Sequence, residues 1–171
     1  MVQDDPRRRR RSARSDIGQM TGMVSDEQLA DILAPAGWHP SRRVNIDEAR
    51  GLWLQRGHTA SEAAVNFASE FDGITFKYPR HKPADGEYQC SIDAILAARS
   101  IHPSVVRSYE ERVHEPLCPV GLAASGHVVL MISPSGKIFG GYDAFLALYG
   151  ETGREAIWNI FHRIKGAVVS G

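Results

Sequence analysis

The sequence offers little support for disulfide, metal or redox chemistry. Its 171 residues include only two cysteines, Cys90 and Cys118, and these show no C-x-x-C spacing. Two unpatterned thiols are typical of a reducing compartment rather than of a secreted, disulfide-bonded scaffold. The seven histidines are scattered, and the sequence has neither an H-E-x-x-H nor a G-x-S-x-G motif. We therefore expect no cofactor, no metal and no small-molecule substrate.

A long hydrophobic run is also missing. The longest stretch without a charged residue runs from Pro116 to Gly136 and contains three prolines and three glycines. Such a stretch suits a β-hairpin better than a membrane-spanning helix. No apolar segment follows the N-terminal arginines, which argues against a secretory signal. The sequence therefore predicts a cytoplasmic protein without a membrane partner.

The net charge is zero, but the charges are unevenly distributed. Residues 1–14 carry six arginines and two aspartates, a net charge of +4, so the remainder carries −4. We expect residues 1–24 to form a disordered basic extension and residues 25–171 to form a single domain. The extension either attracts phosphate groups or is a solvated segment without a role. The domain itself is acidic with dispersed basic residues, so we expect it not to bind nucleic acid directly.

Apolar residues at helical spacing predict three helices in the first half of the domain. The first begins at Ser25, which forms a capping-box pattern with Gln28, and ends at Gly37. The second covers residues 46–56. The third begins at another capping-box pattern, T-A-S-E, with Thr59 as the expected N-cap.

The second half of the domain mixes strands with shorter helices. The alternating segment 74–78 predicts a strand, and the polar segment 79–90 predicts a loop. Helices are expected after Ser91, packing Ile92, Ile95 and Leu96, and after Pro103. The run V-V-L-M-I-S-P-S-G-K-I-F, residues 128–139, is the strongest hairpin signal in the chain.

A last helix is expected after Thr152, with Ile157, Ile160, Phe161 and Ile164 on one face and Gly166 after its end. The order of helices, strand, helices, hairpin and helix predicts an α+β domain rather than alternating βαβ units. We expect a mostly antiparallel or mixed sheet with a central hairpin, wrapped by five to six helices.

The segment R-V-H-E-P-L-C-P, residues 112–119, partly matches the zinc-deaminase signature. Its Glu115 directly follows His114, and Cys118 has no partner three residues later. A catalytic zinc needs three protein ligands, and only two candidates are present. The neighbouring acids Glu110, Glu111 and Glu115 could perform acid–base work, but a solvated helix face explains them better. We therefore expect no enzymatic activity.

Four motifs in a fixed order resemble a known family. They are A-G-W-H-P-S-R-R-V-N (36–45), F-A-S-E-F-D-G-I (67–74), L-C-P-V-G (117–121) and the hairpin at 128–139. Together they resemble the SUKH superfamily, and most closely its third clade. The resemblance covers residues 29–166 and implies an α+β fold whose motif residues are structural. Those residues are Gly37, Trp38, Pro40, Arg42, Phe67, Glu70, Phe71, Gly73, Pro119, Val120, Gly121 and Gly136.

The resemblance implies an immunity protein of a bacterial polymorphic toxin system. Such a protein binds and neutralises a cognate toxin domain, often a nuclease or a nucleic-acid deaminase. An acidic surface that competes with nucleic acid for a basic cleft would do this. The candidate contacts are Asp85, Glu87 and Tyr88 in one segment and Glu110, Glu111 and Glu115 in another. A regulatory or scaffold module without a toxin partner is the alternative.

Overall fold

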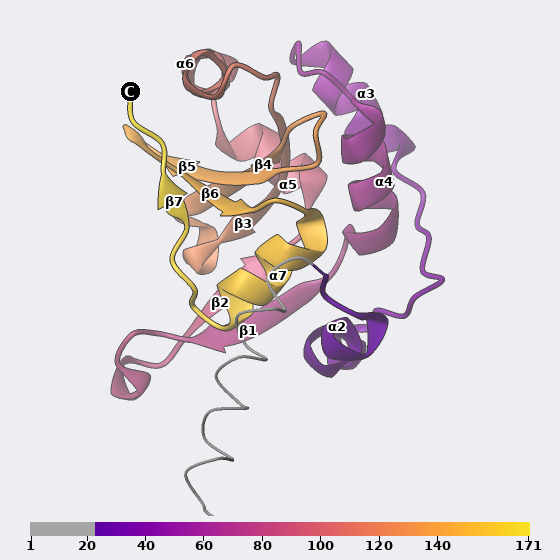
Figure 1. Cartoon of the computed structure of the whole chain (residues 1–171). Helices are drawn as coiled ribbons and strands as arrows, with labels where there is room; N and C mark the ends of the chain where they lie inside the picture. The colour runs from indigo at the N-terminus through magenta and orange to yellow at the C-terminus, as the bar shows by residue number, and fades with distance from the viewer. Residues whose placement is uncertain (1–22) are drawn as a thin grey trace, which may run out of the picture.

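Seven strands form one antiparallel sheet in which every strand lies beside the next one along the chain (Figure 1). The structure is a computed structural model, and it describes residues 23–171. The strands are β1 (Thr75–Pro79), β2 (Glu87–Ser91), β3 (Cys118–Ala123), β4 (Val128–Ile132), β5 (Ile138–Tyr142), β6 (Phe145–Gly150) and β7 (Ala167–Val168). The predicted hairpin at 128–139 is confirmed as the pair β4 and β5.

Six α-helices in the described residues surround this sheet. They are α2 (Asp26–Leu33), α3 (Asp47–Gln55), α4 (Glu62–Phe71), α5 (Ala94–Ser100), α6 (Pro103–Val113) and α7 (Gly153–Phe161). Three short 3₁₀ turns, η1 (Ala34–Ala36), η2 (Pro83–Asp85) and η3 (Ala124–Gly126), complete the order. The predicted α+β class is therefore confirmed. The basic extension expected at residues 1–24 lies, except for its last two residues, outside the described part of the chain.

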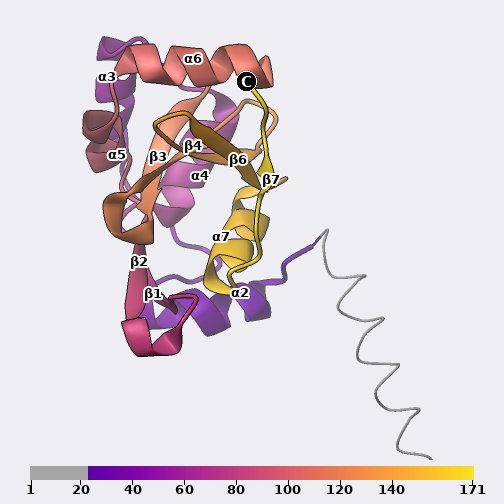
Figure 2. The ribbon, with the colours of Figure 1, turned by 90° about the vertical axis from the view of Figure 1, so that its left-hand side faces the viewer.

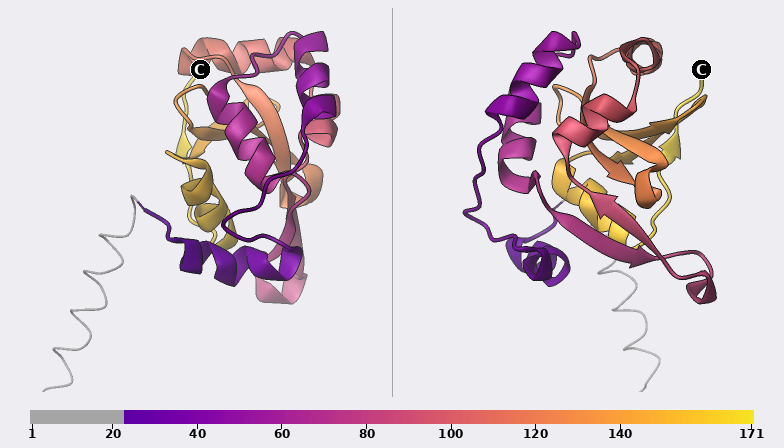
Figure 3. Two further views of the ribbon diagram at one scale, coloured as in Figure 1. Left: turned by 90° about the vertical axis from the view of Figure 1, so that its right-hand side faces the viewer. Right: turned by 180° about the vertical axis from the view of Figure 1, so that it is seen from behind.

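Helices cover both faces of the sheet, which explains the unbroken apolar run of β4. Val128, Leu130 and Ile132 belong to a core shared with α2, α3, α4 and α7, while Val129 and Met131 belong to a second core under α5 and α6. Figure 3 shows α5 on the face of the sheet opposite to α7. A strand buried on both faces reads as continuous rather than alternating hydrophobicity.

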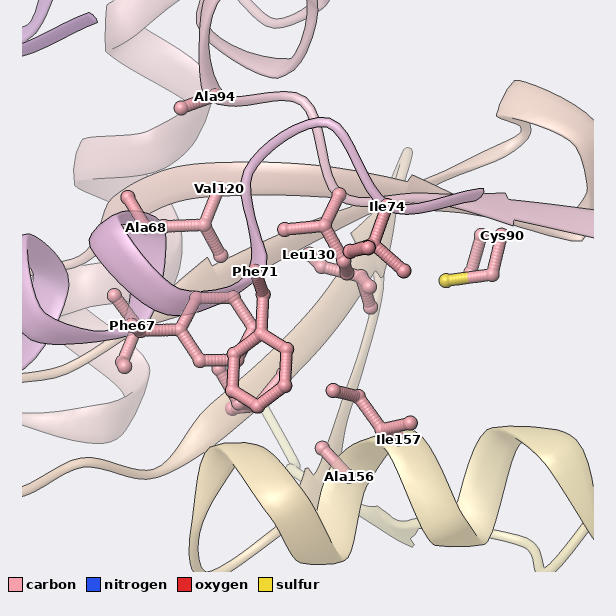
Figure 4. Close-up of a cluster of buried hydrophobic side chains, with 14 of the residues drawn as sticks. Phe67, Ala68, Phe71, Ile74, Cys90, Ala94, Val120, Leu130, Ala156 and Ile157 are labelled. Atoms are coloured by element: carbon pink, nitrogen blue, oxygen red, sulfur yellow. The ribbon is translucent and has the colours of Figure 1, made fainter. Parts of the chain in front are cut away.

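The larger core lies between α4, α7 and the sheet. Figure 4 shows Phe67 and Phe71 of α4 pointing into this core, towards Ile157 of α7. The two phenylalanine rings have their centroids 5.0 Å apart and are tilted by 43°, a favourable aromatic arrangement. Phe71 and Ile157 are almost completely buried. This packing fixes α7 against α4, although about eighty residues separate them in the sequence.

Local hydrogen bonds decide where the helices begin. The predicted capping box at Ser25 is confirmed, because its hydroxyl accepts from the Gln28 backbone N–H and Gln28 accepts in return. The expected cap at Thr59 is wrong, because Ser61 accepts from Ala64 N–H and α4 begins at Glu62. The expected cap at Ser91 is also wrong: Ser91 lies in β2, and Asp93 caps α5 instead.

The segment 79–90 is not the loop that its polar composition predicts. Its second half forms β2, which pairs with β1 in a hairpin closed by η2. On this strand Cys90 is buried, Tyr88 and Ser91 are partly shielded, and Glu87 and Gln89 are exposed. The polar residues that suggested a loop are therefore the solvent-facing side of a strand that is covered on one face.

Two predicted apolar stripes differ from the observed ones. In α5 the buried residues are Ala94, Ala97 and Ala98, whereas Leu96 is 46% exposed. Small alanine side chains allow this helix to lie close to β3, so the larger Leu96 points outward. Helix α7 ends at Phe161, which leaves Ile164 outside the helix and 50% exposed.

Backbone elements approach one another closely at two glycines of the sheet. A Cβ atom on Gly150 would lie 2.4 Å from the backbone nitrogen of Ala156, and one on Gly121 would lie 2.8 Å from the carbonyl oxygen of Ser91. Real Cβ atoms do not tolerate such distances to backbone atoms. The contacts of α7 with β6 and of β3 with β2 therefore need a residue without a side chain.

We predict that Gly150→Ala lowers the free energy of unfolding by about 1–3 kcal/mol, because the new methyl group overpacks a backbone contact. The matched control is Gly51→Ala in α3, where a Cβ atom would meet nothing within 4 Å. That change should raise stability by about 0.5–1 kcal/mol, because alanine favours a helix interior. Urea unfolding of both variants checks the pair, and equal effects would contradict the close approach at Gly150.

Candidate functional site

The Trp38 side chain is buried beside a polar cluster that joins three helices. Its indole is 3% exposed, stacks on Phe71 with ring centroids 6.4 Å apart, and donates to a Glu70 side-chain oxygen at 3.3 Å. The same Glu70 oxygen accepts from Arg154 at 3.1 Å, and Arg154 also pairs with Asp26. Helices α2, α4 and α7 are therefore connected through one polar cluster beside a buried tryptophan.

Arg42 completes this cluster from the segment between η1 and α3. Its guanidinium donates to the backbone carbonyls of Glu70 and Asp72, each at 2.6 Å. The Asp72 carboxylate in turn accepts from the backbone N–H of Ala94, at 2.8 Å, where α5 begins. Burial is the main cause that raises the pKa of Asp72. The Arg42 guanidinium is thus bound to backbone carbonyls at the C-terminal end of α4.

The motif residues Pro119, Val120 and Gly121 also serve internal contacts. Trp53 of α3 is completely buried and donates its indole N–H to the carbonyl of Pro119, at 2.8 Å. Val120 is buried in β3, and Gly121 allows the close approach described above. Gly136 has a φ of +87°, as the turn between β4 and β5 requires. These residues stabilise the domain and do not indicate which part of its surface binds a partner.

The six predicted contact residues fall into two groups at opposite ends of the domain, one near the β1–β2 turn and one on α6 and just beyond its end (Figures 1 and 2). At the first end Asp85 and Glu87 are exposed, but Lys77, Arg80 and Lys82 lie on the same hairpin. This end is therefore not acidic. Tyr88 is half-buried, packs on Tyr78 with centroids 5.7 Å apart, and lies under the Arg80 guanidinium.

At the α6 end, only one of the three glutamates is free of a protein contact. Glu110 accepts from the backbone N–H of Leu117 at 2.9 Å, and Glu115 accepts from the Ser135 hydroxyl at 3.0 Å. Glu111 is exposed, with no hydrogen bond to another described residue. Glu110 therefore stabilises the connection from α6 to β3.

Sequence reasoning missed an apolar groove beside the β1–β2 hairpin. It has a volume of about 450 Å³ and lies between this hairpin, the end of α7, and strands β6 and β7. Its apolar wall includes Tyr78, Tyr88, Tyr149, Ile164 and Val168. Ile164 was expected in the core stripe of α7, and β7 was not predicted. The sequence signal for the groove was Ile164, an apolar residue that follows the end of α7.

The described residues show no reactive group poised for catalysis. Cys90 and Cys118 are both buried, and burial raises the pKa of both thiols, which keeps them protonated. His114 is exposed at the end of α6, whereas Cys118 points into the core. Among residues 23–171 no three His, Cys, Asp or Glu side chains gather to hold a metal. No helix in this range is long and apolar enough to cross a membrane.

A comparison with protein families assigns the chain to one of them. Residues 25–162 match the model of the SUKH-3 immunity protein family, a range that begins at the cap of α2 and ends just after α7. The chain belongs to this family. No curated protein and no solved structure shows significant similarity to it. The family assignment therefore rests on the family-model match over residues 25–162, and it connects the chain with toxin immunity.

We predict that Trp38→Ala lowers the free energy of unfolding by about 3–5 kcal/mol, because it removes a buried aromatic side chain. Trp38→Phe keeps much of the packing on Phe71 and loses the bond to Glu70, which should cost about 1 kcal/mol. Chemical denaturation monitored by circular dichroism measures both. A Trp38→Ala variant as stable as the parent would contradict the structural role of this tryptophan.

A second prediction concerns His58, which is 5% exposed and whose Nε2 atom has no partner among the described residues. Burial, and then the charges of Arg56 and Arg107, lower its pKa below the ordinary value of 6.5. Just below pH 6.5, His58 therefore binds a proton in the unfolded chain but not in the folded chain. Stability should fall as the pH drops below about 6.5, until the folded-state pKa is passed.

His58→Gln should reduce this acid-dependent loss, while His39→Gln on the surface should leave it unchanged. Urea unfolding at a series of pH values between 7 and 5 measures the effect. If the slope of stability against pH is the same in both variants, then His58 does not cause it.

Proposed function

We propose that this chain binds a cognate toxin domain, of the nuclease or nucleic-acid deaminase type, and neutralises it by blocking its active cleft. The observation that carries the proposal is the match to the SUKH-3 immunity protein family over residues 25–162. In this proposal the chain works in the cytoplasm, where such a toxin would reach its substrate. It acts by occupying a surface and not by chemistry of its own.

The arrangement of the motif residues supports this mode of action. Trp38, Arg42, Glu70 and Gly121 all serve contacts within the domain. A toxin would therefore be recognised by side chains outside the motifs. The exposed Glu111 on α6 and the exposed Asp85 and Glu87 on the hairpin remain proposed contacts to a basic toxin surface.

Co-expression with the product of the adjacent gene tests the proposal. We predict that cells expressing that product alone lose viability and that equal expression of this chain restores it. The two proteins should purify as a one-to-one complex. Gly51→Ala, which leaves the surface almost unchanged, should protect as well as the parent and serves as the matched control.

A purified toxin also reveals whether its cleft is covered. If it is, an excess of nucleic-acid substrate should relieve the inhibition, because substrate and this chain compete for one site. An adjacent product that is harmless, or that kills despite equal expression of this chain, would refute toxin immunity. A regulatory or scaffold module would then remain.

A further inference from the structure

The groove between the β1–β2 hairpin and the C-terminal strand is the most distinctive surface of the described domain. Six large hydrophobic side chains of the described residues are exposed, and two of them, Ile164 (50%) and Val168 (67%), line this groove. A third, Tyr142, stacks on the groove residue Phe145 with ring centroids 4.9 Å apart. Exposed apolar side chains that gather around a hollow mark an interaction site.

Two cationic side chains, both from the segment between α7 and β7, border this apolar surface. Arg163 and Lys165 line the groove together with His81, and all three residues are exposed. No aspartate or glutamate lines it. Lys165 forms no ion pair with the described residues, and Arg163 donates to the backbone carbonyl of Arg80 at 2.8 Å rather than to a carboxylate. The positive charge at the rim is therefore not neutralised from within the described domain.

Contacts within the domain hold the two walls of the groove in place. The Arg163 bond links the end of α7 to the hairpin, and the Tyr78 hydroxyl accepts from the backbone N–H of Ala124 at 2.9 Å. Asn159 of α7 donates to the backbone carbonyl of Tyr149 at 2.8 Å. A groove built in advance lowers the ordering cost of binding.

We infer that this groove binds an acidic segment of the toxin and takes up one aromatic or aliphatic side chain of that segment. The inference rests on the proposed function and names the surface that performs it. The apolar wall would receive the anchor side chain, and Lys165 and Arg163 would pair with the flanking carboxylates. Of the six contact residues expected from the sequence, only Tyr88 lies in this groove.

The charge of the rim also decides between possible occupants. The N-terminal extension of this chain carries a net charge of +4 over residues 1–14, so the cations of the groove repel it. A nucleic acid would be attracted by the cations. However, a single strand is bound along a positively charged groove that follows its backbone, and Arg163 and Lys165 are the only arginine or lysine residues of the described chain that line this groove. An acidic peptide matches both the apolar wall and the cationic rim.

A peptide titration of the full chain tests this inference. The probe is a peptide with one tryptophan flanked by two aspartates on each side, and the reference is the same peptide with lysines. We predict saturable amide shifts at the groove residues in nuclear magnetic resonance spectra and about tenfold weaker binding of the lysine peptide. Equal binding of both peptides, no binding, or shifts elsewhere would overturn the inference. So would tighter binding of a ten-nucleotide single-stranded DNA.

Two groove variants and two matched controls connect the peptide to the toxin. Ile164→Glu and Lys165→Glu should each weaken binding of the acidic peptide about tenfold. The controls are Leu96→Glu and Arg99→Glu on α5, which packs on the face of the sheet opposite to α7. Leu96 is 46% exposed, close to the 50% of Ile164. The controls should leave binding unchanged, and thermal melts should show that all four variants fold.

The same four variants are then compared in the co-expression assay. The inference expects that the groove variants lose protection and that the α5 variants keep it. Full protection by the groove variants would refute the groove as the docking site and leave toxin immunity standing. Peptide binding by a parent chain that gives no protection would refute toxin immunity instead.

Discussion

The guanidinium of Arg42 lies between the backbone carbonyls of Glu70 and Asp72, and the mutual positions of four helices depend on this contact. The last carbonyls of a helix have no partner within that helix, and a buried carbonyl without a partner costs about 1–3 kcal/mol. Arg42 binds two carbonyls at once. Their residues then reach outward: the Glu70 side chain binds Trp38 and Arg154, and the Asp72 carboxylate binds the start of α5.

This junction also explains the role of the motif at residues 36–45, which contains a tryptophan, a histidine and two arginines. Its tryptophan is buried and its first arginine is occupied by backbone oxygens. The family motifs are therefore used to fasten α2, α4, α5 and α7 around the sheet. A partner would therefore bind a part of the surface where apolar residues of the sheet are left uncovered.

The β1–β2 hairpin provides such a place. Between β2 and the rest of the sheet the ladder has a single pair, Ser91 with Leu122, so the hairpin extends beyond the body of the domain (Figure 2). The chain end returns as β7 along the other side. The groove lies between them, next to the end of α7. Binding of a protein segment there, as proposed, agrees with a family associated with immunity.

Most helices and the central hairpin followed from local patterns, because an apolar stripe, a capping side chain or a turn glycine acts within a few residues. Ser25 and Thr152 are examples, each accepting from the backbone N–H three residues later. Strands β2, β3, β6 and β7 did not follow. A strand covered on one face can look polar like β2, and the two-residue β7 exists only because β6 lies beside it.

The sequence by itself therefore determined the α+β class, the order of most elements and the family resemblance. Only the tertiary structure decided which predicted contact residues share a surface. It separated Glu111 from Tyr88, engaged Glu110 in a backbone bond, and brought Tyr88 beside Ile164 and Lys165. The physical reason is that capping and periodicity are local, whereas a groove is formed by side chains from distant segments whose distances are set by packing.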